Sequence, residues 1–181
     1  APTSMEVLEA IRQRRSIRAF KPDPVSRDTI DEILTVAQRA PSGTNTQPCH
    51  VYVCGGAVKQ AITDDVLAAI ARGQNKSYDE FGYYPAKWTD LHNSRRRTLG
   101  WALYGLLGIQ KGDREAGTRQ ALRNFEFFDA PVGLFVTIDD YLGQGNWADV
   151  GMYIQTIMLA AKGFGLDTCP QAAWVPYQEV V

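Results

Sequence analysis

The chain has 181 residues, of which 45% are hydrophobic and 22% charged, and its formal net charge is −1 at pH 7. This length suits one domain with its own core, and this composition is typical of a folded globular protein. The near-zero charge gives no global reason to bind nucleic acid or an anionic membrane. The sequence therefore predicts a single domain over residues 1–181 that binds neither.

The sequence shows no pattern for membrane insertion, secretion or metal binding. The longest apolar stretch, around residues 130–138, is too short to cross a bilayer. The first six residues lack the charged start and apolar core of a secretory signal, which favours a cytoplasmic location. Cys49, Cys54 and Cys169 are odd in number, and neither histidine completes a zinc-ligand pattern with them. We expect reduced, mostly buried cysteines and no metal site.

The first half of the chain alternates helix-forming patterns with breaks at proline and glycine. Ser4 is placed to cap the first helix, because a serine side chain can accept from backbone N–H groups of the first turn. We predict, in order, a helix with Val7, Leu8 and Ile11 on one face, a helix from about Ser26 to the break at Pro41, a loop at 41–48, a buried strand at 50–54 and a helix at about 58–72.

The second half begins with an irregular segment. Residues 73–93 are rich in aromatic side chains without a clean period, which is typical of a surface excursion or lid and makes them a candidate substrate wall. Helical spacing then returns. We predict, in order, helices at about 94–107 and 113–128, a central strand at 132–138, a helix at 147–161 and a final strand near Thr168. Strands bracketed by helices indicate an α+β fold.

Three arginines and a serine lie within five residues after the first helix, at Arg14, Arg15, Ser16 and Arg18. Guanidinium groups pair bidentately with phosphate, and a serine hydroxyl adds a further donor. A solvated basic helix end that answers the helix dipole explains the same residues without a ligand. Taken alone, the segment favours this second explanation.

The loop from Ala40 to Pro48 carries a glycine, small hydroxyl groups and two amides between two prolines. Such a loop can crowd donors against a flat polar heterocycle, although a plain tight turn can have the same composition. The order of the segments favours a ligand site, because a basic cluster, a helix, this loop and a strand follow one another directly.

Together these segments resemble the FMN-dependent nitroreductase family, whose members carry R-R-S-x-R-x-F followed by a P-S-x-x-N-x-Q-P loop. Both patterns are complete here, at residues 14–20 and 41–48. The resemblance continues through D-x-G-x-x-x-Q at 149–155 and C-P-Q-A at 169–172, and residues 123–133 look closest to the branch that includes nitrobenzoate-type reductases. It implies a nitroreductase-like α+β fold with a central, mostly antiparallel sheet flanked by helices, in a domain-swapped homodimer.

The resemblance also implies roles for individual residues. Residues 14–16 would hold the phosphate and ribityl chain of FMN, and Arg18 would lie at the pyrimidine edge, where its charge raises the reduction potential. Residues 41–45 would come from the opposite subunit, residues 170–172 would lie along the ring, and Asn124 would reach it from another helix. The predicted cofactor-binding residues are Arg14, Arg15, Ser16, Arg18, Pro41, Ser42, Gly43, Asn45, Asn124, Pro170, Gln171 and Ala172.

The sequence departs from the family pattern in two places. Cys49 stands where the family often has a tryptophan, so the packing there must differ. Family members also continue past the position of Val181 into a segment that adds a basic phosphate contact and wraps around the partner subunit. We expect either that this segment is cut off or that the phosphate site depends on Arg14 and Arg15 alone.

The resemblance predicts an oxidoreductase that takes hydride from NADH or NADPH and reduces a small aromatic acceptor, such as a nitroaromatic or a quinone, by a ping-pong mechanism. FMN carries the chemistry, so no catalytic residue is predicted besides Arg18 as an electrostatic modulator. Reductive dehalogenation, flavin fragmentation, a flavin-binding protein with little turnover and a basic-patch interaction protein remain alternatives. The run at 95–97 is interpreted as a solvated helix face, and Trp101 and Tyr104 as core residues.

Overall fold

The structure is a computed structural model that describes residues 5–74 and 83–181. The predicted cap at Ser4 and the middle of the predicted lid, residues 75–82, lie outside the described residues. The chain forms two compact units, Ala1–Gln60 with Phe128–Pro170 and Ala61–Phe127 with Gln171–Val181. None of the described helices is long and apolar enough to cross a membrane.

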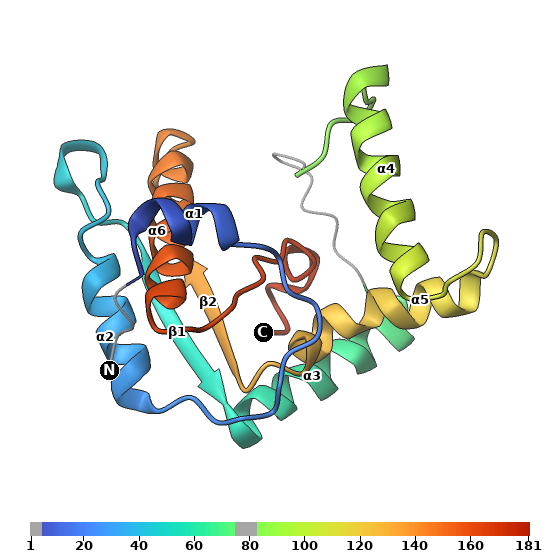
Figure 1. Ribbon diagram of the computed structural model, residues 1–181, viewed down its shortest axis with the longest axis horizontal. Helices are drawn as coiled ribbons and strands as arrows, with labels where there is room; N and C mark the ends of the chain where they lie inside the picture. Colours follow the sequence, from blue (N-terminus) through green and yellow to red (C-terminus); the bar gives the residue numbers. More distant parts are fainter. Residues whose placement is uncertain (1–4, 75–82) are drawn as a thin grey trace. The chain divides into compact units, whose positions relative to one another are not determined.

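The first unit is built around an antiparallel pair of strands, with helices α1, α2 and α6 (Figure 1). The strands pair in register from His50 opposite Thr137 to Gly55 opposite Val132. The predicted antiparallel pairing is therefore confirmed. The elements of this unit are α1 (Val7–Gln13), α2 (Arg27–Ala37), the 3-10 helix η1 (Gly43–Asn45), β1 (His50–Gly55), β2 (Val132–Thr137) and α6 (Gly145–Gly163).

The core of this unit lies between α2 and α6, and both helices contribute residues four positions apart. Ile33 and Ala37 of α2 pack with residues 153, 157 and 161 of α6, and side chains of both strands contact this cluster. Four-residue spacing places side chains on one face of a helix, so each helix buries one face. Helix α2 starts next to Ser26, as predicted, and Ser26 caps it, since its hydroxyl accepts from the Thr29 N–H at 3.2 Å.

The second unit has an aromatic core. Phe125 and Phe127 contact Trp174 with ring centroids 5.2 and 4.6 Å apart, and Phe125 also contacts Tyr177. The Thr63 hydroxyl donates to the Phe125 carbonyl at 2.7 Å and ties this core to α3. The elements are α3 (Gly56–Ala71), which begins in the first unit, α4 (Asp90–Leu106), α5 (Arg114–Leu122) and the 3-10 helices η2 (Arg123–Asp129) and η3 (Val175–Tyr177).

Three predictions of local structure were wrong. Instead of a final strand near Thr168, a single parallel bridge joins this residue to Ser16. The helix predicted to reach residue 128 ends at Leu122, and residues 127–129 adopt left-handed backbone that no α-helix accepts. Strand β1 is not buried, because Tyr52 is 62% exposed and Val53 49% exposed.

Candidate functional site

The basic segment after α1 lies beside the segment that follows α6. Ile17 donates its N–H to the Thr168 carbonyl at 3.1 Å, within the bridge between Ser16 and Thr168. The Arg18 guanidinium donates to the Ser16 carbonyl at 3.4 Å. The structure thus brings residues 16–18 next to Thr168 and Cys169.

Arg14 and Arg15 have the chemistry that a phosphate needs. Within residues 5–74 and 83–181, neither guanidinium forms an ion pair or a side-chain hydrogen bond, whereas the nearby Arg12 lies 3.7 Å from Glu9. Arg14 is half-buried and Arg15 exposed. Two adjacent guanidinium groups without a carboxylate suit a doubly charged phosphate, because each can donate a bidentate pair of hydrogen bonds. These residues fit the phosphate of FMN.

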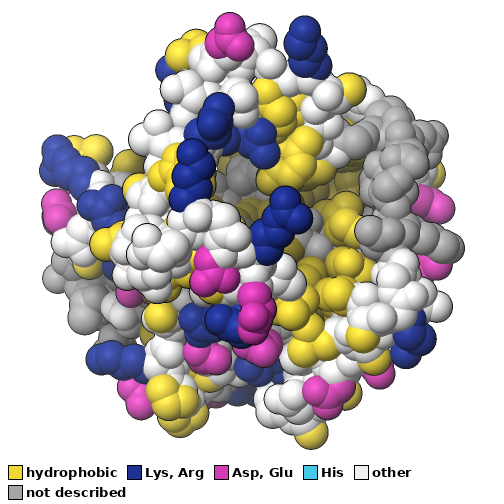
Figure 2. Space-filling model, turned by 90° about the vertical axis from the view of Figure 1, so that its right-hand side faces the viewer, with side chains coloured by type: hydrophobic (Ala, Val, Ile, Leu, Met, Phe, Trp, Pro, Cys, Tyr) yellow, Lys and Arg dark blue, Asp and Glu magenta, His cyan; other side chains and the backbone are white. Residues whose placement is uncertain are grey.

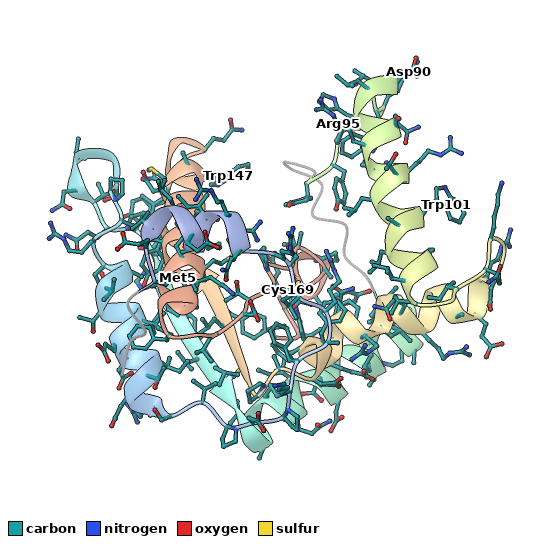
Figure 3. All side chains as sticks on the ribbon, in the orientation of Figure 1. Met5, Asp90, Arg95, Trp101, Trp147 and Cys169 are labelled. Carbon is teal, nitrogen blue, oxygen red and sulfur yellow. The ribbon has the colours of Figure 1, made fainter. Side chains whose placement is uncertain are left out.

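Cys169 lies close enough to Arg18 for the Arg18 charge to affect the pKa of its thiol. Burial raises the pKa of the Cys169 thiol, and the nearby Arg18 guanidinium lowers it in part. Cys169 is labelled in Figure 3, on the segment that follows α6. The positive charge of Arg18 therefore acts on Cys169, the residue before Pro170. If a ring were bound there, this charge would stabilise a negative charge that develops on it.

The loop at 41–48 has a strained backbone that hydrogen bonds hold in place. Thr44, Asn45 and Gln47 have φ values of 49°, 59° and 49°, in the left-handed region that costs about 1–2 kcal/mol per residue. The Ser42 hydroxyl accepts from the Gln47 N–H at 2.9 Å, and the Gly43 N–H donates to the Asp149 carboxylate at 3.1 Å. Strain of this kind persists where the surroundings impose it, and it concentrates at functional sites.

The hollow behind this loop is too small for a flavin. Its volume of about 30 Å³ is enough for roughly one water molecule. The hollow is lined by Gln38, Ala40, Pro41, Ser42, Gln47, Pro48, Cys49, Asp149 and Tyr153.

Within one chain the two motifs are not brought together. In Figure 1 the loop at 41–48 and the segment at 14–18 lie on opposite sides of helices α1 and α6. The resemblance places residues 41–45 in the opposite subunit, and this arrangement agrees with that prediction without testing it.

In the second unit, Asn124 and Gln171 are joined by two hydrogen bonds. The Gln171 amide donates to the backbone carbonyl and the side-chain oxygen of Asn124, at 2.8 and 3.1 Å. The Trp174 indole N–H donates to the Gln171 oxygen at 3.2 Å, and the Asn124 amide donates to the Ala121 carbonyl at 3.0 Å. These bonds engage the polar side-chain groups of both residues, and the Ala172 carbonyl accepts from the Val175 N–H at 3.2 Å.

Helix α4 carries an exposed basic and aromatic surface. The Arg96 guanidinium lies 4.3 Å from the centre of the Trp88 ring. Asp90, Arg95 and Trp101 project from α4 in Figure 3, and Figure 2 shows hydrophobic and basic side chains exposed on this side of the molecule. The prediction of a solvated face at 95–97 is confirmed, but Trp101, 46% exposed, is not a core residue. A hollow of about 360 Å³ lies along α4, and all its lining residues belong to this one helix.

The structure adds one residue that the predicted site did not include. Asp149 was recognised only as part of a motif, yet it is 5% exposed and contacts the loop at 41–48. Its signal in the sequence is an acidic residue within the otherwise apolar face of α6. Among the described residues, no group of three or more His, Cys, Asp or Glu side chains is arranged to hold a metal ion.

Comparison with known proteins identifies the family that this fold and this site define. The Nitroreductase family model matches residues 11–180, and the chain belongs to this family. The 4-nitrobenzoate reductase of Pseudomonas putida is 40% identical over 171 residues, which are 94% of this chain and 74% of that protein.

Solved structures agree with this assignment and with the nitroreductase-like α+β fold. An FMN and NADPH-dependent nitroreductase from Sphigopyxis sp. strain HMH has a TM-score of 0.91 and 41% identity, over 96% of this chain and 78% of that one. The FMN-dependent nitroreductase from Mycobacterium smegmatis in complex with NADPH has a TM-score of 0.88 and 30% identity, over 94% and 76%.

Proposed function

We propose that the chain is an FMN-dependent NAD(P)H oxidoreductase that reduces nitroaromatic or quinone-type acceptors. One observation carries the proposal: Arg14 and Arg15, whose guanidinium groups have no carboxylate partner among the described residues, lie in a segment bridged to the chain around Thr168. The similarity to relatives named as 4-nitrobenzoate reductase and as FMN and NADPH-dependent nitroreductase supports the cofactor, the donor and the acceptor class.

Each part of the site has a task. Arg14, Arg15 and Ser16 bind the phosphate and ribityl chain, and Arg18 holds a fixed positive charge at the pyrimidine edge of the ring. As the resemblance implies, residues 170–172 lie along the ring and orient it, and Asn124 reaches it. When bound, FMN supplies the redox chemistry, accepting a hydride from the nicotinamide nucleotide and giving two electrons to the acceptor after the nucleotide has left.

We propose further that the active form is a domain-swapped homodimer in which Pro41, Ser42, Gly43 and Asn45 reach the flavin of the other subunit. Helix α1 supports this, because Val7, Leu8 and Ile11 are 67%, 64% and 50% exposed in the single chain. A contiguous apolar surface on a folded protein is typically covered by a partner. Light scattering during size-exclusion chromatography would give twice the chain mass, and a monomer that binds FMN fully would contradict the shared site.

A cytoplasmic location is also proposed. All three cysteines are free, with only Cys54 fully buried among them, and free thiols agree with a reducing compartment.

Steady-state kinetics tests the proposed activity. With FMN bound, NADH or NADPH oxidation should depend on a nitroaromatic or quinone acceptor, and plots at several acceptor concentrations should give the parallel lines of a ping-pong mechanism. Turnover of a halogenated aromatic, or fragmentation of the flavin itself, in place of this reaction would favour the other activities of the fold. Bound flavin with negligible nucleotide oxidation would indicate a flavin-binding protein instead.

A further inference from the structure

The flavin-binding loop needs an outside support. Thr44, Asn45 and Gln47 all adopt left-handed backbone without being glycines. Two backbone bonds stay within the loop, from the Asn45 N–H to the Ser42 carbonyl and from the Thr46 N–H to the Gly43 carbonyl. Such turns form and open easily, because local bonds alone do not overcome left-handed strain.

Asp149 supplies the support from helix α6. Its Oδ1 accepts from the Gly43 N–H at 3.1 Å, and its Oδ2 accepts from the Asn146 amide at 3.0 Å. Among the described residues, no other side chain outside the loop hydrogen-bonds to it. A hydrogen bond to a carboxylate is stronger than one between neutral groups, which suits a contact that must hold a strained segment.

Burying the Asp149 carboxylate costs free energy unless hydrogen bonds or an opposite charge compensate it. The residue is 5% exposed, and in the part of the chain that the structure describes no lysine or arginine forms an ion pair with it. A buried carboxylate requires donors, and here half of its hydrogen bonding is given to the loop. Gly43 lies beside this carboxylate, since a Cβ added to it would be in ordinary van der Waals contact with Oδ2, at 3.8 Å.

We propose that Asp149 is a positioning residue that holds the loop at 42–47 in its flavin-binding conformation. This inference rests on the proposed function, because it assigns the loop to FMN. Asp149 touches neither the substrate nor the cofactor in this account. It acts through the Gly43 N–H, and it sets the shape that the exposed face of the loop presents.

The test compares Asp149→Ala, Asp149→Asn and the matched control Asn146→Ala, which removes a bond to the same carboxylate but leaves the loop contact. FMN affinity is measured by flavin fluorescence quenching. We expect Asp149→Ala to weaken FMN binding about tenfold and Asp149→Asn about threefold, because an amide oxygen still accepts from Gly43, while Asn146→Ala changes it less than about twofold.

A second readout uses the flavin-free full-length chain. Hydrogen exchange in peptides that cover residues 41–48 should quicken in Asp149→Ala, while peptides from the α2 and α6 core keep the parent rate. In Asp149→Asn the Cys49 thiol should alkylate faster, because burial and, to a smaller extent, the Asp149 charge raise its pKa. A residue needed only for general stability would raise exchange throughout the first unit.

The outcomes separate the inference from the proposed function. A parent protein that binds no FMN refutes the proposed function, and loop exchange still decides whether Asp149 holds the loop. Parent-like FMN affinity or parent-like loop exchange in Asp149→Ala overturns the inference alone. If Asp149→Ala fails to fold, Asp149→Asn tests the inference in its place. Parent-like FMN affinity, loop exchange and Cys49 reactivity in Asp149→Asn would then overturn the inference.

Discussion

The two segments proposed to bind FMN are held in different ways. The loop at 41–48 has a strained backbone fixed by its own hydrogen bonds and by a buried carboxylate, whereas the segment at 14–18 is extended and tied to its neighbour by a single bridge. The loop would contribute a fixed backbone shape to the proposed site, and the segment would contribute positive charge. A site of this kind divides the work between preorganised geometry and electrostatic attraction, and the two contributions should respond differently to salt and to mutation.

The largest effect should come from removing the charge. We expect Arg14→Ala combined with Arg15→Ala to weaken FMN binding at least about 100-fold, because hydrogen bonds to charged groups contribute about 1.5–3 kcal/mol each. The remaining affinity should also depend less on salt. Titration of flavin fluorescence at two salt concentrations measures both.

Arg12→Ala is the matched control for this pair. It removes a guanidinium in the last turn of α1, just before the segment, that lies near Glu9. Binding in this variant should match the parent protein. An equal loss in Arg12→Ala would mean that general positive charge, rather than the two unpaired groups, attracts the cofactor.

Arg18 should affect the reaction more than the binding. We expect Arg18→Ala to slow flavin reduction about tenfold, which corresponds to about 1.4 kcal/mol of lost stabilisation of developing charge, while FMN affinity falls less. Stopped-flow mixing with NADH or NADPH gives the rate. An unaltered rate would remove Arg18 from its proposed place at the ring.

The loop should respond to lost geometry without a change in salt dependence. Ser42→Ala removes the hydroxyl that accepts from the Gln47 N–H, and we expect about fivefold weaker FMN binding, the effect of one hydrogen bond of about 1 kcal/mol. The salt dependence should equal that of the parent. If it changed as in the arginine variant, the distinction between shape and charge would not hold.

The smallest effect concerns the thiol beside Arg18. Burial raises the pKa of Cys169 and Arg18 lowers it in part, so Arg18→Ala should raise this pKa further. A higher pKa leaves less thiolate at a given pH near neutrality, and alkylation of Cys169 in the flavin-free protein should slow about two- to threefold. Mass spectrometry of the Cys169 peptide follows the reaction; faster alkylation would contradict the proximity of Arg18.

Local patterns predicted the elements whose stability is local or periodic. The start of α2 next to Ser26 follows from the breaks at Pro22 and Pro24, and the buried faces of α2 and α6 follow from four-residue spacing. Helix α4 begins at Asp90, earlier than predicted, because Thr89 provides a cap that the aromatic segment before it obscured. The strand near Thr168 failed because one bridge to Ser16 does not extend into a ladder.

The rest depends on contacts between distant parts of the chain. Residues 127–129 leave the helical conformation although residues 118–130 contain no glycine or proline. Phe127 and Phe128 are both buried, and the Phe20 N–H donates to the Phe128 carbonyl. No local pattern shows these contacts. The motifs give the candidate site residues, which stay a prediction. The hydrogen bonds between Asn124 and Gln171 and the contact of Asp149 with Gly43 join residues far apart in sequence, and no motif shows them.

The central claim is that this chain binds FMN and reduces it with a nicotinamide nucleotide. The visible absorption spectrum of the purified protein, reconstituted with FMN and then mixed anaerobically with NADH or with NADPH, tests it most directly. The account predicts a protein-bound flavin spectrum that bleaches with at least one nucleotide, which also identifies the donor. A protein that stays colourless after incubation with FMN, or a bound flavin that neither nucleotide bleaches, would contradict it.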